Sequence, residues 1–431
     1  MKLLLATFMF TLYSVSSRSV FDNKFMETRN KKTFVDKTLL VEEFMRHKYL
    51  FVNAPSKFGK STNLDMISLF LGNQRPKDEI EKYFKDTKLW NSNAFVKQNL
   101  GEHPIVHFNL KIVGASTVLD NILTAFKVAV YNAISDHMYL FDSEKISDDQ
   151  RKMLEIYADL TSCRLVDANT VSSGLNFLVE VLHTHHGKPV ILLADEYGRG
   201  ISEGIIHNKK DLPAIVEWYS SVLNKTFANE NLIAHALISG ENWLYGVKSP
   251  VLPKFKLIPF MQSVEFITYF GFTHDEVKDL LVKFDLSHNF DEVIKWYGGY
   301  TSSDGLFKLA NPFSISEYFA YKKESVYWTG SALADELIGI MVGEESLKAQ
   351  VVHLVLRNTV EVDLKKDIRI DDILLLKNQV EQLPQYCENF FFRLLVEAGY
   401  LTFAEPQPNK DKTTVRVANE EVQSAMVSYT L

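Results

Sequence analysis

The sequence predicts an α/β fold: a parallel sheet covered by helices, followed by a mainly helical C-terminal region. Residues 188–194 and 232–238 are short, continuously apolar runs rich in branched side chains, which is typical of strands buried on both faces. These runs alternate with stretches of helical periodicity, and that alternation favours helical crossovers between parallel strands. The composition is ordinary for a globular protein, with 46% hydrophobic and 23% charged residues among 431.

The predicted elements of the core follow one another as helix, strand, loop and helix. Residues 35–47 carry apolar side chains near helical spacing, and the apolar run at 49–52 predicts the first strand. A helical pattern follows at 64–70, and a further strand is predicted at 104–110. Residues 117–186 are expected to be mainly helical, because Pro and Gly do not clearly interrupt them.

From about residue 265 the sequence changes to helices and turns. Thr273 and Glu276 have the spacing of a capping box, which predicts the start of a helix over 275–283. Residues 290–296 and 314–321 predict further helices. We therefore divide the chain into a core at 18–262 and a helical lid or C-terminal region at 263–431.

The N-terminus has the three parts of a secretory signal peptide. Lys2 is followed by an apolar run from Leu3 to Tyr13 and then by small residues at 15–17. We expect residues 1–17 to be a signal peptide and the protein to be secreted or to enter the secretory pathway; the alternative is a buried N-terminal helix. That run is short for a bilayer, and no later segment is long and apolar enough, so we expect no membrane span.

Composition also restricts the binding partners. The net charge of −7 and a pI near 6.0 argue against a nucleic-acid-binding surface as the main function. The sequence identifies neither a protein partner nor an oligomeric state. Cys163 and Cys387 lack metal-binding spacing, and two buried thiols are preferred over a disulfide of an exported protein. His183, His185 and His186 cannot all face one ion from one helix.

The loop between the first strand and its helix has the sequence of a phosphate-binding P-loop. Backbone N–H groups of such a loop and the start of the following helix cradle phosphates. Lys60 is expected to reach the terminal phosphates and Ser61 to ligate Mg²⁺. The usual first glycine is Ala54 here, and the alternative is an ordinary strand-to-helix turn. The candidate nucleotide-binding residues are Ala54, Pro55, Ser56, Lys57, Phe58, Gly59, Lys60, Ser61 and Thr62.

A pair of carboxylates follows the buried run at 188–194. The carboxyl ends of parallel strands share one edge of a sheet, so Asp195 and Glu196 are expected beside the loop. We assign Asp195 to the Mg²⁺ shell and Glu196 to polarising the attacking water, as the catalytic residue. Ser239 and Asn242 follow the next strand and are possible water-positioning residues. The alternatives are an acidic surface turn and an ordinary loop.

Together these residues resemble the AAA-ATPase-like domain family, whose bacterial members commonly carry a PD-(D/E)XK nuclease domain after it. Residues 54–61 are similar to the family loop R-P-R-R-F-G-K-S, which also lacks the first glycine, and residues 195–197 match D-E-Y-D. We expect this nuclease domain to be absent from the chain. Further blocks that agree in order are Phe34–Thr38, Phe270–Thr273, Trp296–Tyr300, Asn311–Ser314, Tyr327–Trp328, Gly399–Thr402 and Asn419–Val422.

The resemblance implies a P-loop NTPase with ATP and Mg²⁺ as cofactors. The chain departs from the family at Ser56 and Lys57, which replace arginines, at Gly198, which replaces an acid, and at Gly200, where proline is frequent. Two functions follow. One is Mg²⁺-dependent ATP binding, with hydrolysis. The other is a secreted binding or effector module that keeps the fold without catalysis.

The aromatic residues of the later blocks have a structural interpretation that we prefer to ligand binding. Large aromatic side chains at helix ends and turns dominate the burial of a core. We therefore expect these residues to pack the lid against the core. They are Trp296, Tyr297, Tyr300, Phe313 and Trp328.

Overall fold

The computed structural model describes most of the chain after residue 22. The described residues are 23–110, 118–207, 210–241, 243–244, 246–328, 332–341, 345–363, 370–377, 385–404 and 413–429. The predicted signal peptide and Asn242 lie outside them. Among the described residues, no helix combines the length and the apolar character that a bilayer crossing requires.

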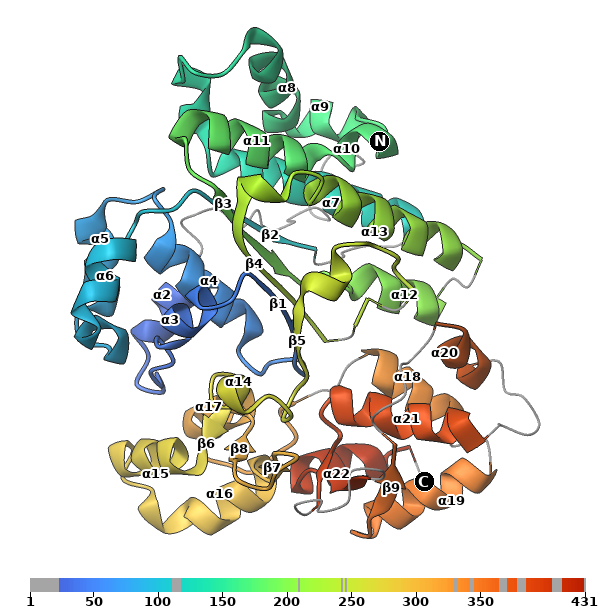
Figure 1. Cartoon of the computed structure of the whole chain (residues 1–431). Coiled ribbons are helices and arrows are strands. Elements are labelled where there is room, and N and C mark those ends of the chain that lie inside the picture. Colours follow the sequence, from blue (N-terminus) through green and yellow to red (C-terminus); the bar gives the residue numbers. More distant parts are fainter. Residues whose placement is uncertain are drawn as a thin grey trace, which may run out of the picture.

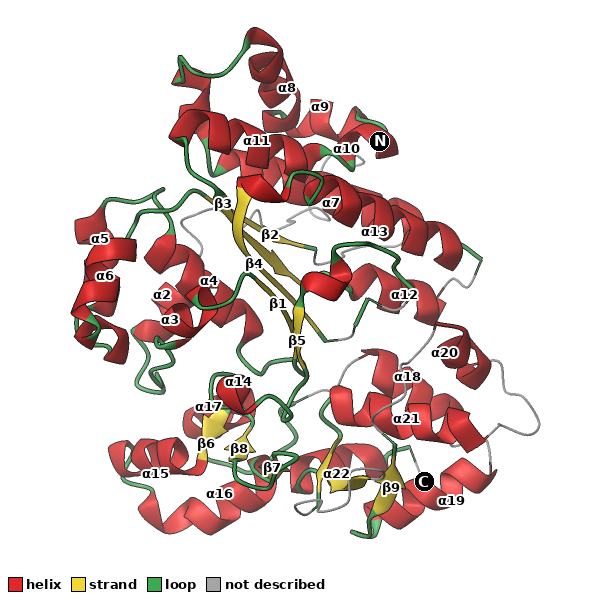
Figure 2. Ribbon diagram, in the orientation of Figure 1, coloured by secondary structure: helices red, strands yellow, loops and turns green. Residues whose placement is uncertain are grey.

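The centre of the molecule is a five-stranded parallel sheet with helices around it, which confirms the predicted fold class (Figure 2). Its strands run in the order β2-β3-β4-β1-β5, and every neighbouring pair is parallel. β3 is buried along its whole length, as expected for a strand covered on both faces. The strands are β1 (Tyr49–Asn53), β2 (Ile105–Asn109), β3 (Val190–Asp195), β4 (Ile233–Gly240) and β5 (Lys256–Ile258).

The strand register brings four strand ends to one edge of the sheet. Asn109 pairs with Asp195 across β2 and β3, and Asn53 pairs with Gly240 across β1 and β4. Because the strands are parallel, the loops that leave these positions gather at the same edge. That edge carries the candidate site.

The helices of the core lie on two sides of the sheet (Figure 1). One group, on the left of the view, comprises α2 (Lys24–Arg29), α3 (Leu40–Met45), α4 (Lys60–Leu71), α5 (Lys77–Phe84) and α6 (Asn93–Asn99). The other comprises α7 (Val118–Ser135), α8 (Asp148–Ala158), α9 (Leu160–Leu165), α10 (Ala168–Val171), α11 (Gly174–His186), α12 (Arg199–His207) and α13 (Leu212–Thr226). Short 3₁₀ turns are η1 (Lys88–Asn91), η2 (Met138–Asp142), η3 (Glu230–Leu232), η4 (Leu252–Lys254) and η5 (Ser287–Asn289).

Two predicted helical segments are more broken than the sequence pattern indicates. The segment at 35–47 is helical only over α3, because the Asp36 carboxylate accepts hydrogen bonds from the backbone and hydroxyl of Thr38 and stabilises a turn. Residues 117–186 form several helices. Ser147, Asp159 and Asp167 each cap a new one, so polar capping residues, rather than Pro or Gly, mark the breaks.

The C-terminal region combines helices with two small antiparallel sheets. Thr273 and Glu276 form the predicted capping box at the start of α15. The sheets have the orders β6-β8-β7 and β10-β11-β9, and their strands are too short for a periodicity signal. The elements are α14 (Val264–Ile267), β6 (Phe272–Thr273), α15 (His274–Lys283), α16 (Phe290–Tyr297), β7 (Tyr300–Thr301), β8 (Lys308–Ala310), α17 (Pro312–Tyr321), α18 (Ala332–Met341), α19 (Glu345–Val355), β9 (Val360–Val362), α20 (Ile370–Lys377), α21 (Gln385–Glu397), β10 (Leu401–Phe403), β11 (Thr413–Val417) and α22 (Glu420–Val427).

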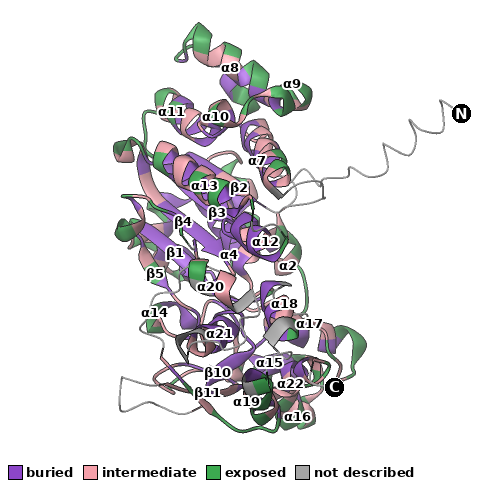
Figure 3. Ribbon diagram, turned by 90° about the vertical axis from the view of Figure 1, so that its right-hand side faces the viewer, coloured by how far each residue is buried: buried purple, intermediate pink, exposed green. Residues whose placement is uncertain are grey.

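The main hydrophobic core continues from the sheet into the C-terminal region. Its buried members include Phe51 of β1, Tyr300 of β7 and Phe391 of α21. Figure 3 shows buried ribbon running from the central strands into the lower part of the molecule. A smaller cluster joins α15, α16 and α17. The sheet and the C-terminal region therefore share one hydrophobic core.

We predict that Gly399→Ala destabilises the fold, because Gly399 joins the C-terminal region closely to the core. Its φ is +83°, and an added Cβ would lie 2.7 Å from Cγ of Pro55. The strained backbone and the close contact should lower the free energy of unfolding by roughly 1–3 kcal/mol. Urea denaturation measures the change. Gly339→Ala, on an exposed position of α18 with no atom within 4 Å, is the matched control and should not destabilise.

Candidate functional site

The turn from β1 into α4 forms the floor of the candidate site. α4 begins at Lys60, and its N-cap Gly59 has a φ of 92° that favours glycine. A helix start of this kind presents unpaired N–H groups and the positive end of the helix dipole. Pro55 and Phe58 are buried, whereas Lys57 is exposed and also left-handed, with a φ of 63°. The segment 54–61, here called the 54–61 loop, is thus shaped to accept an anion.

Lys60 is folded over this loop. Its Nζ donates to the backbone oxygens of Ala54 at 2.7 Å and Pro55 at 2.8 Å, and the side chain is buried. These carbonyls satisfy the buried ammonium group. The two backbone carbonyls are neutral acceptors. Charged phosphate oxygens would therefore bind the same ammonium group more strongly.

The carboxylate of Asp195 is the centre of the polar network. It is fully buried at the end of β3. One carboxylate oxygen accepts from the Ser61 hydroxyl at 2.5 Å and from the Asn109 amide at 2.9 Å. The other accepts from the Ser239 hydroxyl at 2.7 Å. The network therefore joins α4, β2 and β4 to β3, and it brings together Ser61, Asp195 and Ser239 as the sequence predicts.

Asn109 is a site residue that the sequence analysis missed. Asn109 is the last residue of β2, within the strand predicted at 104–110, and it pairs with Asp195 at the same edge of the sheet. A polar residue at the carboxyl end of a parallel strand was the signal that could have found it.

Glu196 lies half-buried beside this network. Burial, with the nearby carboxylates of Asp195 and Glu241, raises the pKa of Glu196 to about 7, while Lys60 and Arg199 oppose the shift. Its φ of 55° is left-handed, which costs a residue with a side chain some free energy. A carboxyl group with a pKa near neutrality can both accept and donate a proton at physiological pH.

A cavity of about 740 Å³ lies over the 54–61 loop. Ser56 to Thr62 line it together with Asn109 and Glu196, whereas Ala54 and Pro55, the first two residues of the loop, are buried and do not line it. Six basic side chains and three acidic ones line it, so it favours an anion. The basic residues are Lys24, Lys31, Lys37, Lys57, Lys60 and Arg199, and the acidic ones are Glu196, Glu241 and Glu317.

The C-terminal region holds the outer side of the 54–61 loop. The Trp328 indole donates to the backbone oxygen of Ser56 at 3.0 Å. The ring of Phe58 packs edge-on against Phe260 and Tyr300, with centroids 4.9 and 5.0 Å away. Tyr300 and Trp328 have the expected packing role, because both are buried members of the main core. Tyr297 is buried in the smaller cluster of the C-terminal region instead, and Trp296 is only partly buried against that cluster. Phe313 is different, because it is only partly buried and lines the cavity.

The histidines of α11 make separate contacts. His183 lies 3.0 Å from the oxygen of Lys188, and His186 lies 2.8 Å from the Tyr139 hydroxyl. Cys163 is a buried free thiol, whereas the side chain of Cys387 lies outside the described residues.

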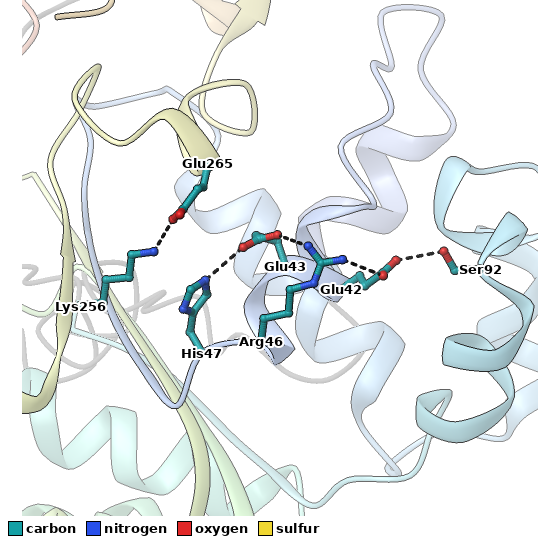
Figure 4. A network of polar contacts seen from close by, with 7 residues as sticks. All are labelled: Glu42, Glu43, Arg46, His47, Ser92, Lys256 and Glu265. Carbon is teal, nitrogen blue, oxygen red and sulfur yellow. Dashed lines mark hydrogen bonds and ion pairs between the residues drawn. The ribbon is translucent and has the colours of Figure 1, made fainter. Parts of the chain in front are cut away.

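Among the described residues, one cluster has the composition of a metal site, and its residues do not line the cavity. Glu43, His47 and Glu265 place ligand atoms within 4.8 Å of one another (Figure 4). Each carboxylate already has a basic partner. Arg46 lies 2.8 Å from Glu43, and Lys256 pairs with Glu265. We interpret this network as surface ion pairs.

The parallel sheet, with its loop and helix start at the carboxyl edge, defines an α/β protein of the P-loop NTPase fold class. A family model described as "Predicted AAA-ATPase" matches residues 22–242, which span β1 to β4 and all the described residues of the Asp195 network. The chain belongs to this AAA-ATPase-like family. No curated protein matches the chain.

We predict that Glu196→Gln changes how stability depends on pH. A carboxyl whose pKa is higher in the folded state binds more protons when folded, so its stabilising contribution is lost as the pH rises from about 4.5 to about 7. Glutamine cannot ionise. The variant should match wild type near pH 4.5 and exceed it above pH 7 by on the order of 1–3 kcal/mol.

Urea denaturation at several pH values measures this difference. The exposed Glu155→Gln is the control and should leave the pH profile unchanged. A pH-independent difference between wild type and Glu196→Gln would contradict the assigned environment of Glu196.

Proposed function

We propose that the protein binds ATP with Mg²⁺ over the 54–61 loop and hydrolyses it. The observation that carries this proposal is the 2.5 Å hydrogen bond between Ser61 and Asp195, which joins the loop helix to the acidic strand end. Lys60 begins that helix, and its ammonium group can exchange two backbone oxygens for phosphate oxygens. Membership of a predicted ATPase family supports a nucleotide as the ligand.

Ser61, at the start of α4, and Asp195, at the end of β3, have the chemistry of Mg²⁺ ligands. Magnesium prefers oxygen ligands. The Ser61 hydroxyl lines the cavity, and the buried Asp195 carboxylate accepts its hydrogen bond at 2.5 Å. We assign both residues to holding the ion. When bound, Mg²⁺ neutralises phosphate charge. Asn109 and Ser239 orient the Asp195 carboxylate, because each donates a hydrogen bond to it.

We assign proton transfer from the attacking water to Glu196. This carboxyl lines the cavity, and its pKa of about 7 lets it accept a proton near neutral pH. Ser239 acts on the water indirectly, by positioning Asp195. Asn242, which follows β4 in the sequence, remains a proposed water-positioning residue.

We also propose that the protein enters the secretory pathway, on the strength of the apolar run from Leu3 to Tyr13 and its flanks. An exported chain meets little ATP, and Ser56 and Gly198 depart from the family pattern. These features support the second function, a binding module that keeps the fold without turnover. Nucleotide binding without phosphate release would favour it.

We predict that Lys60→Ala weakens Mg²⁺–ATP binding at least about tenfold, because it removes the buried ammonium group from the loop. Calorimetric titration of the purified protein measures this change. Lys152→Ala removes an exposed lysine of α8 and is the matched control, with unchanged affinity. Equal affinities of Lys60→Ala and wild type would show that ATP does not bind at this loop.

We predict that Glu196→Gln leaves the affinity for Mg²⁺–ATP within about threefold of wild type but lowers phosphate release about a hundredfold or more. Glutamine keeps the size of the side chain and cannot accept the proton. A coupled phosphate assay with titration of the same samples separates the two effects. Turnover at the wild-type rate in this variant would remove Glu196 from the reaction.

A further inference from the structure

Four apolar side chains are among the residues that line the cavity over the 54–61 loop. Phe34 and Val35 line it from the segment before α3, Phe272 from β6 and Phe313 from the start of α17. All four side chains are partly exposed, so part of their apolar surface faces outward, although Phe34 also meets the ring of Phe25 and the guanidinium of Arg29. A site for inorganic phosphate alone would not use such a surface, because phosphate has no apolar part to bury.

A helix cap holds the backbone of Phe313. Asn311 caps α17 by accepting from the backbone N–H of Phe313 at 3.0 Å, and Pro312 occupies the first helical turn. The backbone that carries the ring is therefore fixed before any ligand arrives. Little backbone entropy is then lost when a second ring stacks on Phe313.

Lys57 brings the 54–61 loop into contact with Phe313. Its ammonium group lies 3.8 Å from the centroid of the Phe313 ring, and its side chain is exposed. A cation–π contact at an exposed site is weak, whereas a phosphate oxygen is a strong partner for an ammonium group. Phosphates on the 54–61 loop would draw Lys57 toward them, which frees the face of Phe313.

We propose that Phe34, Phe272 and Phe313 form the site for the planar base of a nucleoside triphosphate. The ligand is then a nucleotide held at both ends, rather than a simple polyphosphate. This inference rests on the proposed function, because it places the phosphates on the 54–61 loop. Base stacking on an aromatic ring should raise the affinity roughly tenfold to a hundredfold.

Phe313→Leu and Phe34→Leu test this inference, because leucine keeps an apolar side chain and loses the aromatic face. Each variant is titrated with Mg²⁺–ATP and with Mg²⁺–tripolyphosphate. We expect ATP affinity to fall at least about tenfold in each variant, with tripolyphosphate affinity within about twofold of wild type. Using two variants on separate segments keeps the test valid if one of them fails to fold.

Tyr321→Leu is the matched control, because Tyr321 is an exposed aromatic residue at the end of the same helix. It should change neither affinity. Equal weakening of both ligands in the Phe variants, or unchanged ATP binding, would overturn the base site. Wild-type protein that binds tripolyphosphate as tightly as ATP would overturn the base site and leave the phosphate loop standing. Failure to bind either ligand would contradict the proposed function as well.

Discussion

The buried carboxylate of Asp195 is the interaction on which the candidate site depends. A buried charge is costly unless hydrogen bonds satisfy it, and three side chains donate to this one: Ser61, Asn109 and Ser239. They come from α4, β2 and β4, so one carboxylate fixes the loop helix and two strand ends relative to β3. Its negative charge also helps to raise the pKa of the neighbouring Glu196 to about 7.

The 54–61 loop is held from the side opposite the sheet by residues far away in the sequence. Trp328 donates to the loop, and its own backbone N–H donates to the buried carboxylate of Glu421. That carboxylate also accepts from Ser314, at the start of the helix that carries Phe313. The cavity is thus completed by residues beyond the 22–242 family match, which makes the C-terminal region part of the site.

Two departures from the family pattern, Lys57 and Gly200, make contacts of their own, whereas nothing in the structure explains Gly198. Ser56 contributes its backbone oxygen, rather than its side chain, to the contact with Trp328. Lys57 lies over the ring of Phe313. Gly200 donates its N–H to the Tyr219 hydroxyl, and an added Cβ would lie 2.6 Å from that hydroxyl oxygen. A proline at this position would lose the hydrogen bond and collide with Tyr219.

The sequence alone determined the loop and four of the five strands of the central sheet, because buried parallel strands and a strand–loop–helix turn leave strong local patterns. It did not predict β5, which has only three residues. The capping box of Thr273 and Glu276 is local in the same way and was predicted correctly. Tertiary structure decided what depends on distant partners. Asn109 joined the site through strand register, and Phe313 lined the cavity because α17 packs beside the loop. The small sheets were missed because strands of two to five residues carry too little periodicity.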